Sequence, residues 1–232
     1  MQKFLASQKD ELLGTMQASG IIPVFHHPSA STLMEIISIS YRCGIRVLEF
    51  THQRDSRGLR LFSWLIEETK QFPGLTLGAG TVLDPVTAER YIHAGANFIA
   101  SPFLQTKTAE VCAQHNVLWM PGCSTLEDVK QAHEHGAEAV TILSGNILGP
   151  EFLRQVHKEF PQMLLIPSSG VGLRENNLQT WFDAGAICVR LGEALFSKEA
   201  VAVRDWVKIE TNLYSTLNTI LRIKKSKTIS IL

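Results

Sequence analysis

Residues 44–50 read GIRVLEF, a glycine followed by a short β-rich run, and this form decides the fold. Three later runs repeat it: GANFIAS at 95–101, GAEAVTI at 136–142 and GAICVRL at 185–191. Each glycine suits the end of a helix, where a left-handed residue costs least without a Cβ. Five residues after the glycine, each run presents one strand side chain, namely Glu49, Ala100, Thr141 and Arg190. In a parallel barrel the equal offsets predict one interior layer for these side chains, because alternate strands fill a layer.

Short apolar runs alternate with helical patterns along the whole chain. They predict strands at residues 20–25, 46–50, 75–81, 97–102, 117–122, 139–144, 163–168 and 186–191. Such alternation favours an α/β fold, a (β/α)8 TIM barrel, and the alternative is an open doubly wound sheet. We expect a single domain over 1–232, with its core at 15–200.

The sequence also predicts where several helices begin and end. Asp84 and Pro85 predict a helix start as N-cap and first helical residue, and Ser124 with Glu127 predicts a capping box. An extra helix with an apolar face precedes the first strand. A C-terminal helix is expected at 199–223, followed by a frayed tail at 224–232.

Composition excludes several classes of protein. Lys and Arg together number 22, and so do Asp and Glu, so the basic excess typical of nucleic-acid binding is missing. The first residues are too polar for a signal peptide and no apolar run has the length of a membrane span, which predicts a cytoplasmic protein without a membrane partner. The cysteines lack C-x-x-C spacing, so we expect reduced core thiols rather than disulfides or a zinc site; they are Cys43, Cys112, Cys123 and Cys188.

In a barrel the chemistry lies where the strands end, and several residues there have two interpretations. Glu49 could act as a base or could pair with Arg46, Arg54 or Arg190. Thr81, Ser168 and Ser169 could be turn residues that cap backbone groups. The spacing of His26, His27 and His52 near Glu49 fits no zinc motif. The pair of glycines in Gly78-Ala79-Gly80 is weak evidence for a nucleotide loop, because the third glycine is missing.

Arg190 is harder to interpret as a surface residue. On the last expected strand, Ile187, Val189 and Leu191 form the more apolar face, which should meet the helices. Arg190 then points into the barrel. An interior arginine needs an acidic partner or an anionic ligand, because an unpaired buried charge is costly.

Seven runs, in order over residues 15–200, carry a resemblance to one family: GIIPVF, GIRVLEFT, GAGTVLD, ANFIASP, MPGCST, the segment around Thr141, and PSSGVG. The chain resembles the 2-keto-3-deoxy-6-phosphogluconate and 4-hydroxy-2-oxoglutarate aldolases. The resemblance implies a homotrimeric (β/α)8 class I aldolase that cleaves a 4-hydroxy-2-keto acid to pyruvate and an aldehyde through a lysine Schiff base. It implies no cofactor and no metal ion. By resemblance Glu49 is the proton shuttle, Thr81 lies near the pyruvate carboxylate and Pro102 lines the site, while the phosphate loop is Ser168, Ser169 and Gly170.

The chain departs from the family pattern at the nucleophile. Thr141 stands at the position of the family lysine and Ser144 at that of a proline. Threonine cannot form an imine, and a guanidinium such as that of Arg190 stays protonated. None of the eleven lysines falls within an expected strand, and Lys107 is the only one expected near the barrel mouth. The covalent mechanism is therefore expected to be absent.

Other departures concern the substrate. Gln53 and Arg54 stand where the family has a single arginine, and Glu193 follows Gly192 at the position of a phosphate-binding serine. A carboxylate about 4 Å from a phosphate charge costs about 4 kcal/mol at an effective dielectric constant of about 20, which argues against a phosphorylated substrate.

Two functions remain open. The first is an aldolase-family carbon-carbon lyase that acts on a keto acid, with Glu49 as base, by a non-covalent or metal-assisted route. The second is a catalytically inactive relative that binds a keto acid or sugar acid and holds Glu49 and Arg190 as a fixed ion pair.

Overall fold

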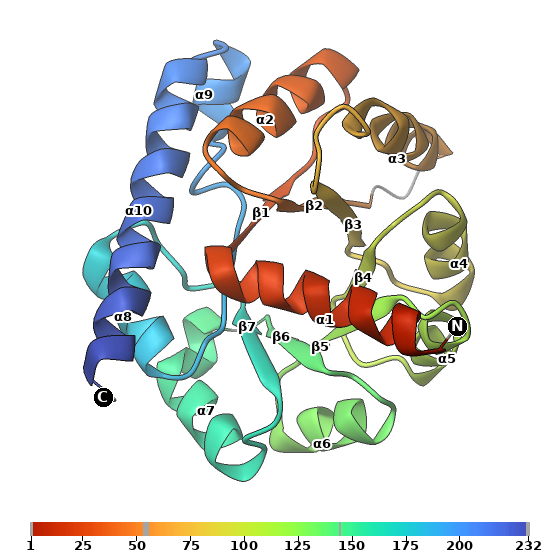
Figure 1. Ribbon diagram of the computed structural model, residues 1–232, viewed down its shortest axis with the longest axis vertical. Helices are drawn as coiled ribbons and strands as arrows, with labels where there is room; N and C mark the ends of the chain where they lie inside the picture. The colour runs from red at the N-terminus through yellow and green to blue at the C-terminus, as the bar shows by residue number, and fades with distance from the viewer. Residues whose placement is uncertain (1, 53–55, 144, 231–232) are drawn as a thin grey trace.

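The computed structural model describes residues 2–52, 56–143 and 145–230, and its eight parallel strands form a ring (Figure 1). All the expected strands are present, as β1 (Ile21–Phe25), β2 (Val47–Thr51), β3 (Thr76–Gly80), β4 (Phe98–Ser101), β5 (Leu118–Cys123), β6 (Ala139–Ile142), β7 (Leu164–Pro167) and β8 (Val189–Leu191). Their order is β7-β6-β5-β4-β3-β2-β1-β8. The ring closes between β7 and β8 through a parallel bridge of Leu165 with Ala186. The fold is a (β/α)8 TIM barrel, as the sequence predicts.

All the described helices except the first surround the strands on the outside of the ring (Figure 1). The helices are α1 (Gln2–Ser19), α2 (Ala30–Arg42), α3 (Ser56–Thr69), α4 (Pro85–His93), α5 (Thr106–Gln114), α6 (Leu126–Glu134), α7 (Gly145–Glu159), α8 (Glu175–Asp183), α9 (Lys198–Ala202) and α10 (Trp206–Ser230). One apolar core lies between the strands and these helices, and a second fills the barrel interior.

The expected N-terminal helix is present as α1, which lies across one end of the barrel in Figure 1. Its side chains Leu12, Leu13 and Met16 are buried in the interior core, together with Val47 and Leu118 from the first residues of β2 and β5. Because these strand residues lie at the amino ends of their strands, α1 closes the amino-terminal end of the barrel. The opposite, carboxyl-terminal end is left for the site.

The glycines that end the expected helices adopt left-handed backbone angles. Their φ values are 96° at Gly44, 99° at Gly95, 81° at Gly136 and 106° at Gly185. This conformation carries no steric cost for glycine, and it turns the chain from each helix into the next strand. Each strand begins after the same left-handed turn, so the side chain five residues after each glycine takes an equivalent place on its strand.

One predicted capping box is displaced by one residue. The N-cap of α6 is Thr125, whose hydroxyl accepts a hydrogen bond from the Asp128 amide at 3.0 Å, while the Asp128 carboxylate accepts from the Thr125 amide at 3.0 Å. The prediction of Ser124 with Glu127 is wrong, because β5 continues to Cys123 and the helix begins one residue later. The predicted start of α4 is confirmed, since the Asp84 side chain caps the helix ahead of Pro85.

The C-terminal region differs from the single helix expected at 199–223. Two helices, α9 and α10, are separated by a break in which Arg204 has a left-handed φ of 55° and Asp205 accepts a hydrogen bond from the Lys208 amide at 3.0 Å. The second helix also continues through the expected tail to Ser230. Lys227 on this extension lies 3.4 Å from Asp183 of α8, which ties it to the barrel. Among the described helices, none has the length and apolar character needed to cross a membrane.

Candidate active site

Four side chains expected in one layer all face the barrel interior. Glu49, Ala100, Thr141 and Arg190 lie on β2, β4, β6 and β8 and are buried. The residues two positions before Glu49, Thr141 and Arg190 belong to the interior core; they are Val47, Ala139 and Cys188. Because side chains alternate along a strand, positions two apart share a face. The inward direction predicted for Arg190 is confirmed.

Glu49 and Arg190 form an ion pair inside the barrel. The Arg190 Nη2 atom donates a hydrogen bond to the Glu49 Oε1 atom across β1, and the two side chains are only 7% and 0% exposed. Charge-assisted hydrogen bonds of this kind are stronger than neutral ones. Within the described part of the chain, the Glu49 Oε2 and Arg190 Nε atoms have no hydrogen-bond partner. The pair therefore keeps a buried acceptor, Glu49 Oε2, and a buried donor, Arg190 Nε, available for a ligand.

Arg46, which was also considered as a partner of Glu49, makes its contacts elsewhere. The Arg46 Nη1 atom donates to the carbonyl oxygens of Tyr41 and Ile45 at 2.9 Å, and its guanidinium covers the Tyr41 ring at 3.8 Å. The expected substrate residues Gln53 and Arg54 lie outside the described residues.

Two glycines on β3 make room for the interior side chains. A Cβ at Gly80 would collide with the Glu49 carboxylate, and a Cβ at Gly78 would collide with the Phe98 ring. The GAG run therefore has a packing reason on this strand, where its glycines let the interior side chains approach the backbone closely. Sequence reasoning missed this role, although glycine inside a strand pattern is the usual indication of such a close approach.

The residue expected at the family lysine position is held in the interior. Thr141 is fully buried, and its hydroxyl donates a hydrogen bond to the Pro121 carbonyl oxygen at 3.2 Å. Ser144, expected at the proline position, lies outside the described residues. Cys188 belongs to the interior core, and burial raises its pKa to about 12, so its thiol remains protonated and unreactive near neutral pH.

Lysines near the mouth are exposed. Lys107 lies in the first turn of α5, as expected after β4, and its side chain is exposed. Lys198 also lies near the mouth, which the sequence did not predict, because it starts the short helix α9 that follows β8. Its side chain is 85% exposed and lies 3.7 Å from Glu193. The expectation that only Lys107 approaches the mouth is therefore wrong.

Thr81, at the end of β3, has a strained backbone. Its φ of 59° lies in the left-handed region, which a β-branched residue rarely adopts. Such strain persists where the surroundings impose it, often at functional positions. Pro102, after β4, is half-buried, and a Cβ at Gly122 on β5 would collide with its carbonyl oxygen.

The expected phosphate loop is held by groups of the protein itself. The Ser168 amide donates to the Ile142 carbonyl oxygen at 3.0 Å, which extends the pairing of β6 with β7. The Ser169 hydroxyl accepts from the Gly145 amide at 3.0 Å and donates to the Leu143 carbonyl oxygen. At Gly170 the φ is 76°, and the carbonyl oxygen accepts from the Trp181 indole nitrogen at 3.2 Å. Ser168 thus extends the sheet, and Ser169 connects this loop to the segment that follows β6.

A cavity of about 390 Å³ lies at the carboxyl ends of β1 and β8, between these strands and the helices α2 and α9, and neither Glu49 nor Arg190 lines it. Gly192 and Glu193 line it with Lys198, His26 and His27. The Glu193 carboxylate is 74% exposed and is paired with Lys198. Solvent screening therefore makes its repulsion of a bound phosphate weaker than the sequence predicts.

The three histidines considered as metal ligands make separate contacts. The His26 ring packs against Phe50 at 5.9 Å between centroids. His27 Nδ1 accepts a hydrogen bond from the Ser29 amide at 3.1 Å, and His52 Nδ1 lies 3.0 Å from the Tyr91 hydroxyl. Glu49 is not in any of these contacts, since its carboxylate is engaged with Arg190.

Known proteins resemble this chain over most of its length. Residues 13–212 match the aldolase family described as KDPG and KHG aldolase. A 2-dehydro-3-deoxy-phosphogluconate aldolase of Pseudomonas aeruginosa is 27% identical over 205 residues, covering 88% of this chain and 90% of the relative. The KHG/KDPG aldolase of Escherichia coli is 26% identical over 169 residues, covering 72% and 76%.

Solved structures show the same fold. The KDPG aldolase of Legionella pneumophila, with pyruvate captured as a covalent carbinolamine, has a TM-score of 0.78 at 22% identity and covers 88% of this chain and 97% of its own. The KDPG aldolase of Zymomonas mobilis has a TM-score of 0.74 at 22% identity and covers 88% and 94%. With the match over residues 13–212, these findings establish that the chain belongs to the KDPG and KHG aldolase family.

Proposed function

We propose that this chain is a member of the aldolase family that binds a 2-keto acid or sugar acid at the barrel mouth without forming a Schiff base. The observation that carries the proposal is the buried ion pair of Glu49 with Arg190 in a barrel interior that also holds Thr141, where the resemblance places a lysine. A class I aldolase needs a neutral amine held against the substrate carbonyl. Thr141 supplies a hydroxyl at that position, and Glu49 is engaged by a guanidinium.

The free donor of Arg190 supports an anionic ligand. Its Nε atom is buried without a hydrogen-bond partner among the described residues, and leaving such a group unpaired is costly. A carboxylate is the usual partner of a guanidinium, because the planar donors match its two oxygens. The carboxylate of a keto acid would satisfy Arg190, with the Thr81 hydroxyl as a second contact at the end of β3.

Borohydride trapping tests the absence of the covalent route. Incubation with pyruvate and borohydride should leave the intact mass unchanged, because none of the described strands carries a lysine. The Legionella pneumophila relative, in which pyruvate was captured covalently, is the positive control. An adduct mapped to any lysine, above all Lys198 or Lys107, would overturn the proposal.

Calorimetric titration tests the binding. Pyruvate and a panel of 4-hydroxy-2-keto acids should bind one per chain, and Arg190→Lys should weaken binding at least tenfold, because it loses the planar donors of the guanidinium. An unchanged affinity in this variant would place the ligand elsewhere. The matched control Arg42→Lys, on the outer face of α2, should bind as the wild type does.

A second candidate is a carbon-carbon lyase that cleaves a 4-hydroxy-2-keto acid non-covalently or with a metal ion. The Glu49 Oε2 atom favours it, since this oxygen has no hydrogen-bond partner among the described residues and could accept a proton. Pyruvate release, measured with and without divalent metal, separates the two candidates. Turnover that Glu49→Gln abolishes supports the lyase, and binding without turnover supports the first proposal.

We also propose the homotrimer that the family resemblance implies. Light scattering coupled to size-exclusion chromatography should give three times the chain mass of 25.8 kDa. A monomer mass would reject it without affecting the ligand proposal, because the ion pair lies within one chain.

A further inference from the structure

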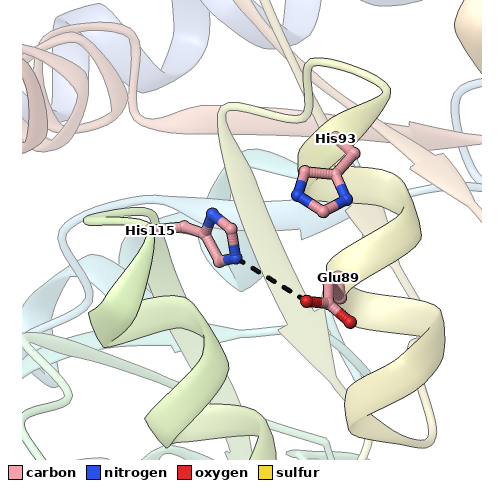
Figure 2. A group of neighbouring side chains, drawn as sticks. All are labelled: Glu89, His93 and His115. Carbon is pink, nitrogen blue, oxygen red and sulfur yellow. Dashed lines mark ion pairs between the residues drawn. The ribbon is translucent and has the colours of Figure 1, made fainter.

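Three potential metal ligands gather on the outer surface, away from the barrel mouth. Figure 2 shows Glu89 and His93 on α4 pointing toward His115 at the end of α5. One ligand atom from each residue lies within 4.8 Å of the others, and His115 Nε2 is 4.0 Å from Glu89 Oε1. The imidazole rings of His93 and His115 are 5.1 Å apart between centroids. Within the described part of the chain, this is the one group of three such residues found so close together.

The spacing of the first two ligands suits a single ion. Glu89 and His93 are four residues apart on one helix, so their side chains share a face, one turn above the other. Ligand atoms held about 2.1 Å from a tetrahedral ion lie about 3.4 Å apart. The Glu89–His115 separation of 4.0 Å exceeds this by about 0.6 Å, and the others, within 4.8 Å, by at most about 1.4 Å, distances that exposed side chains cover by rotations about their χ angles.

The backbone that carries the ligands is anchored. On α4, Ala88 and Tyr91 are buried on the opposite face from Glu89 and His93. His115 is the C-cap residue of α5, and its amide donates to the Val111 carbonyl oxygen at 3.2 Å. Ligands on fixed elements lose less freedom when they bind an ion.

We propose that Glu89, His93 and His115 form a surface site for a late first-row divalent metal ion such as Zn²⁺, Ni²⁺ or Cu²⁺. Two imidazoles and one carboxylate match the preferences of these ions, whereas Mg²⁺ and Ca²⁺ favour all-oxygen sets. Three protein ligands leave at least one coordination position for water, as at other three-ligand zinc sites. The bound ion would connect α4 to α5, two successive helices of the barrel.

The site is independent of the proposed ligand site. Helices of a (β/α)8 barrel run back along their strands, so the last turns of α4 and α5 lie toward the amino-terminal end of the barrel. His115 also lines a cavity of about 370 Å³ with Lys9 and Leu12 of α1, the helix that closes this end. A negative result for the metal would therefore leave the keto acid proposal untouched, and the reverse also holds.

Competition with a chromophoric chelator tests the metal site, using untagged protein treated with EDTA and then titrated with Zn²⁺. We expect one tight equivalent per chain and a loss of at least tenfold in affinity for His93→Gln and for His115→Gln. Glu89→Gln should also weaken binding. All three residues lie on the surface, with the Glu89 and His115 side chains 51% and 30% exposed, so the variants should fold, which circular dichroism checks.

The matched control is the pair His133 and His135, which occupy the last turn and the C-cap of α6. His133→Gln with His135→Gln should retain the tight equivalent. Titration with Cu²⁺ should give an electron paramagnetic resonance spectrum with nitrogen coupling that His93→Gln reduces. Equal uptake by the wild type and the His93→Gln, His115→Gln double variant, or no uptake at one molar equivalent, would overturn the proposal.

Discussion

At the scale of single residues, the buried pair of Glu49 and Arg190 is the most consequential feature. Both side chains are almost completely withdrawn from water. Removing one partner from such a pair leaves an uncompensated buried charge. Arg190→Met should therefore lower the free energy of unfolding by about 3–5 kcal/mol, as measured by urea denaturation.

The control for this prediction replaces both charges. Glu49→Gln combined with Arg190→Met should recover much of the lost stability, because no charge remains buried. Arg42→Met, which breaks the exposed pair with Glu210, should cost about 0.2–1 kcal/mol. A single Arg190→Met variant as stable as the wild type would contradict the buried pair.

Thr81 gives a second prediction at the residue scale. Its left-handed φ of 59° strains a β-branched residue, and glycine adopts that conformation without strain. Thr81→Gly should raise the free energy of unfolding by about 1 kcal/mol, since the relief of about 1–3 kcal/mol exceeds the added entropy of the unfolded chain. It should also weaken keto acid binding by removing the hydroxyl. Thr81→Ser, which keeps the hydroxyl, separates the two effects, and a destabilised Thr81→Gly variant would refute the strain argument.

At the scale of elements, α4 offers a test of a helix cap. Burial opposes ionisation of Asp84, but hydrogen bonds from the Thr87 amide and hydroxyl to its carboxylate outweigh burial and lower its pKa below 3.8. Asp84→Ala should cost about 1 kcal/mol at pH 7. Because the folded pKa is the lower one, the contribution is full above the ordinary pKa of 3.8 and is lost as the pH falls through the folded value.

Urea unfolding of the wild type and Asp84→Ala at pH 7 and near pH 3 measures this pH dependence. The difference in stability between the two proteins should narrow at the lower pH. Thr87→Val, which removes one hydrogen bond but keeps the backbone cap, should cost less than Asp84→Ala at pH 7. A difference that does not change with pH would contradict the role of the ionised carboxylate.

Elements were predictable where the deciding interactions are local. Closing glycines and the Asp84 cap depend on a few neighbouring residues, and the structure confirms them. The α6 cap was placed one residue early because the run STLED contains two possible boxes, and the end of β5 selects Thr125. The break before α10 was missed because a left-handed Arg204 carries no sequence signature comparable to glycine.

At the scale of the whole molecule, the sequence predicted features that follow from the alternation of side chains along a strand and missed those that depend on how helices pack. The alternation of side chains placed Arg190 inside the barrel, and the cost of an unpaired buried charge left an acidic partner or an anionic ligand open for it; the structure shows the acidic partner, Glu49. The metal cluster was different, because only the spacing of Glu89 and His93 is visible in the sequence. His115 joins them through the packing of α5 beside α4, which no local pattern determines.

Neighbouring strands of the barrel are not joined equally well around the ring. The reactivity of the cysteine thiols can show where the ring opens first. The described cysteines are all buried without disulfides, as predicted. Burial raises the pKa of Cys112, Cys123 and Cys188 to about 12, so each reacts only when opening exposes it. Between β7 and β8 the ring closes through one isolated bridge, whereas β6 and β7 pair at four positions and the single pair of β3 with β4, Ala79 with Ile99, is flanked by backbone hydrogen bonds on both sides. Local opening should therefore occur first at the β7–β8 contact.

Cys188 directly precedes β8 at this contact, so it should react with a thiol reagent faster than Cys112 and Cys123. The reaction with 5,5′-dithiobis(2-nitrobenzoic acid) at pH 8, mapped by mass spectrometry, gives the order. Cys112 and Cys123 should react together at a slower rate that rises with urea, because their exposure requires global unfolding. In a Cys43→Ser background, which removes the least buried thiol, Cys188→Ser should remove the faster phase and leave the slower one unchanged. If Cys112 or Cys123 reacted before Cys188, the opening would begin elsewhere in the ring.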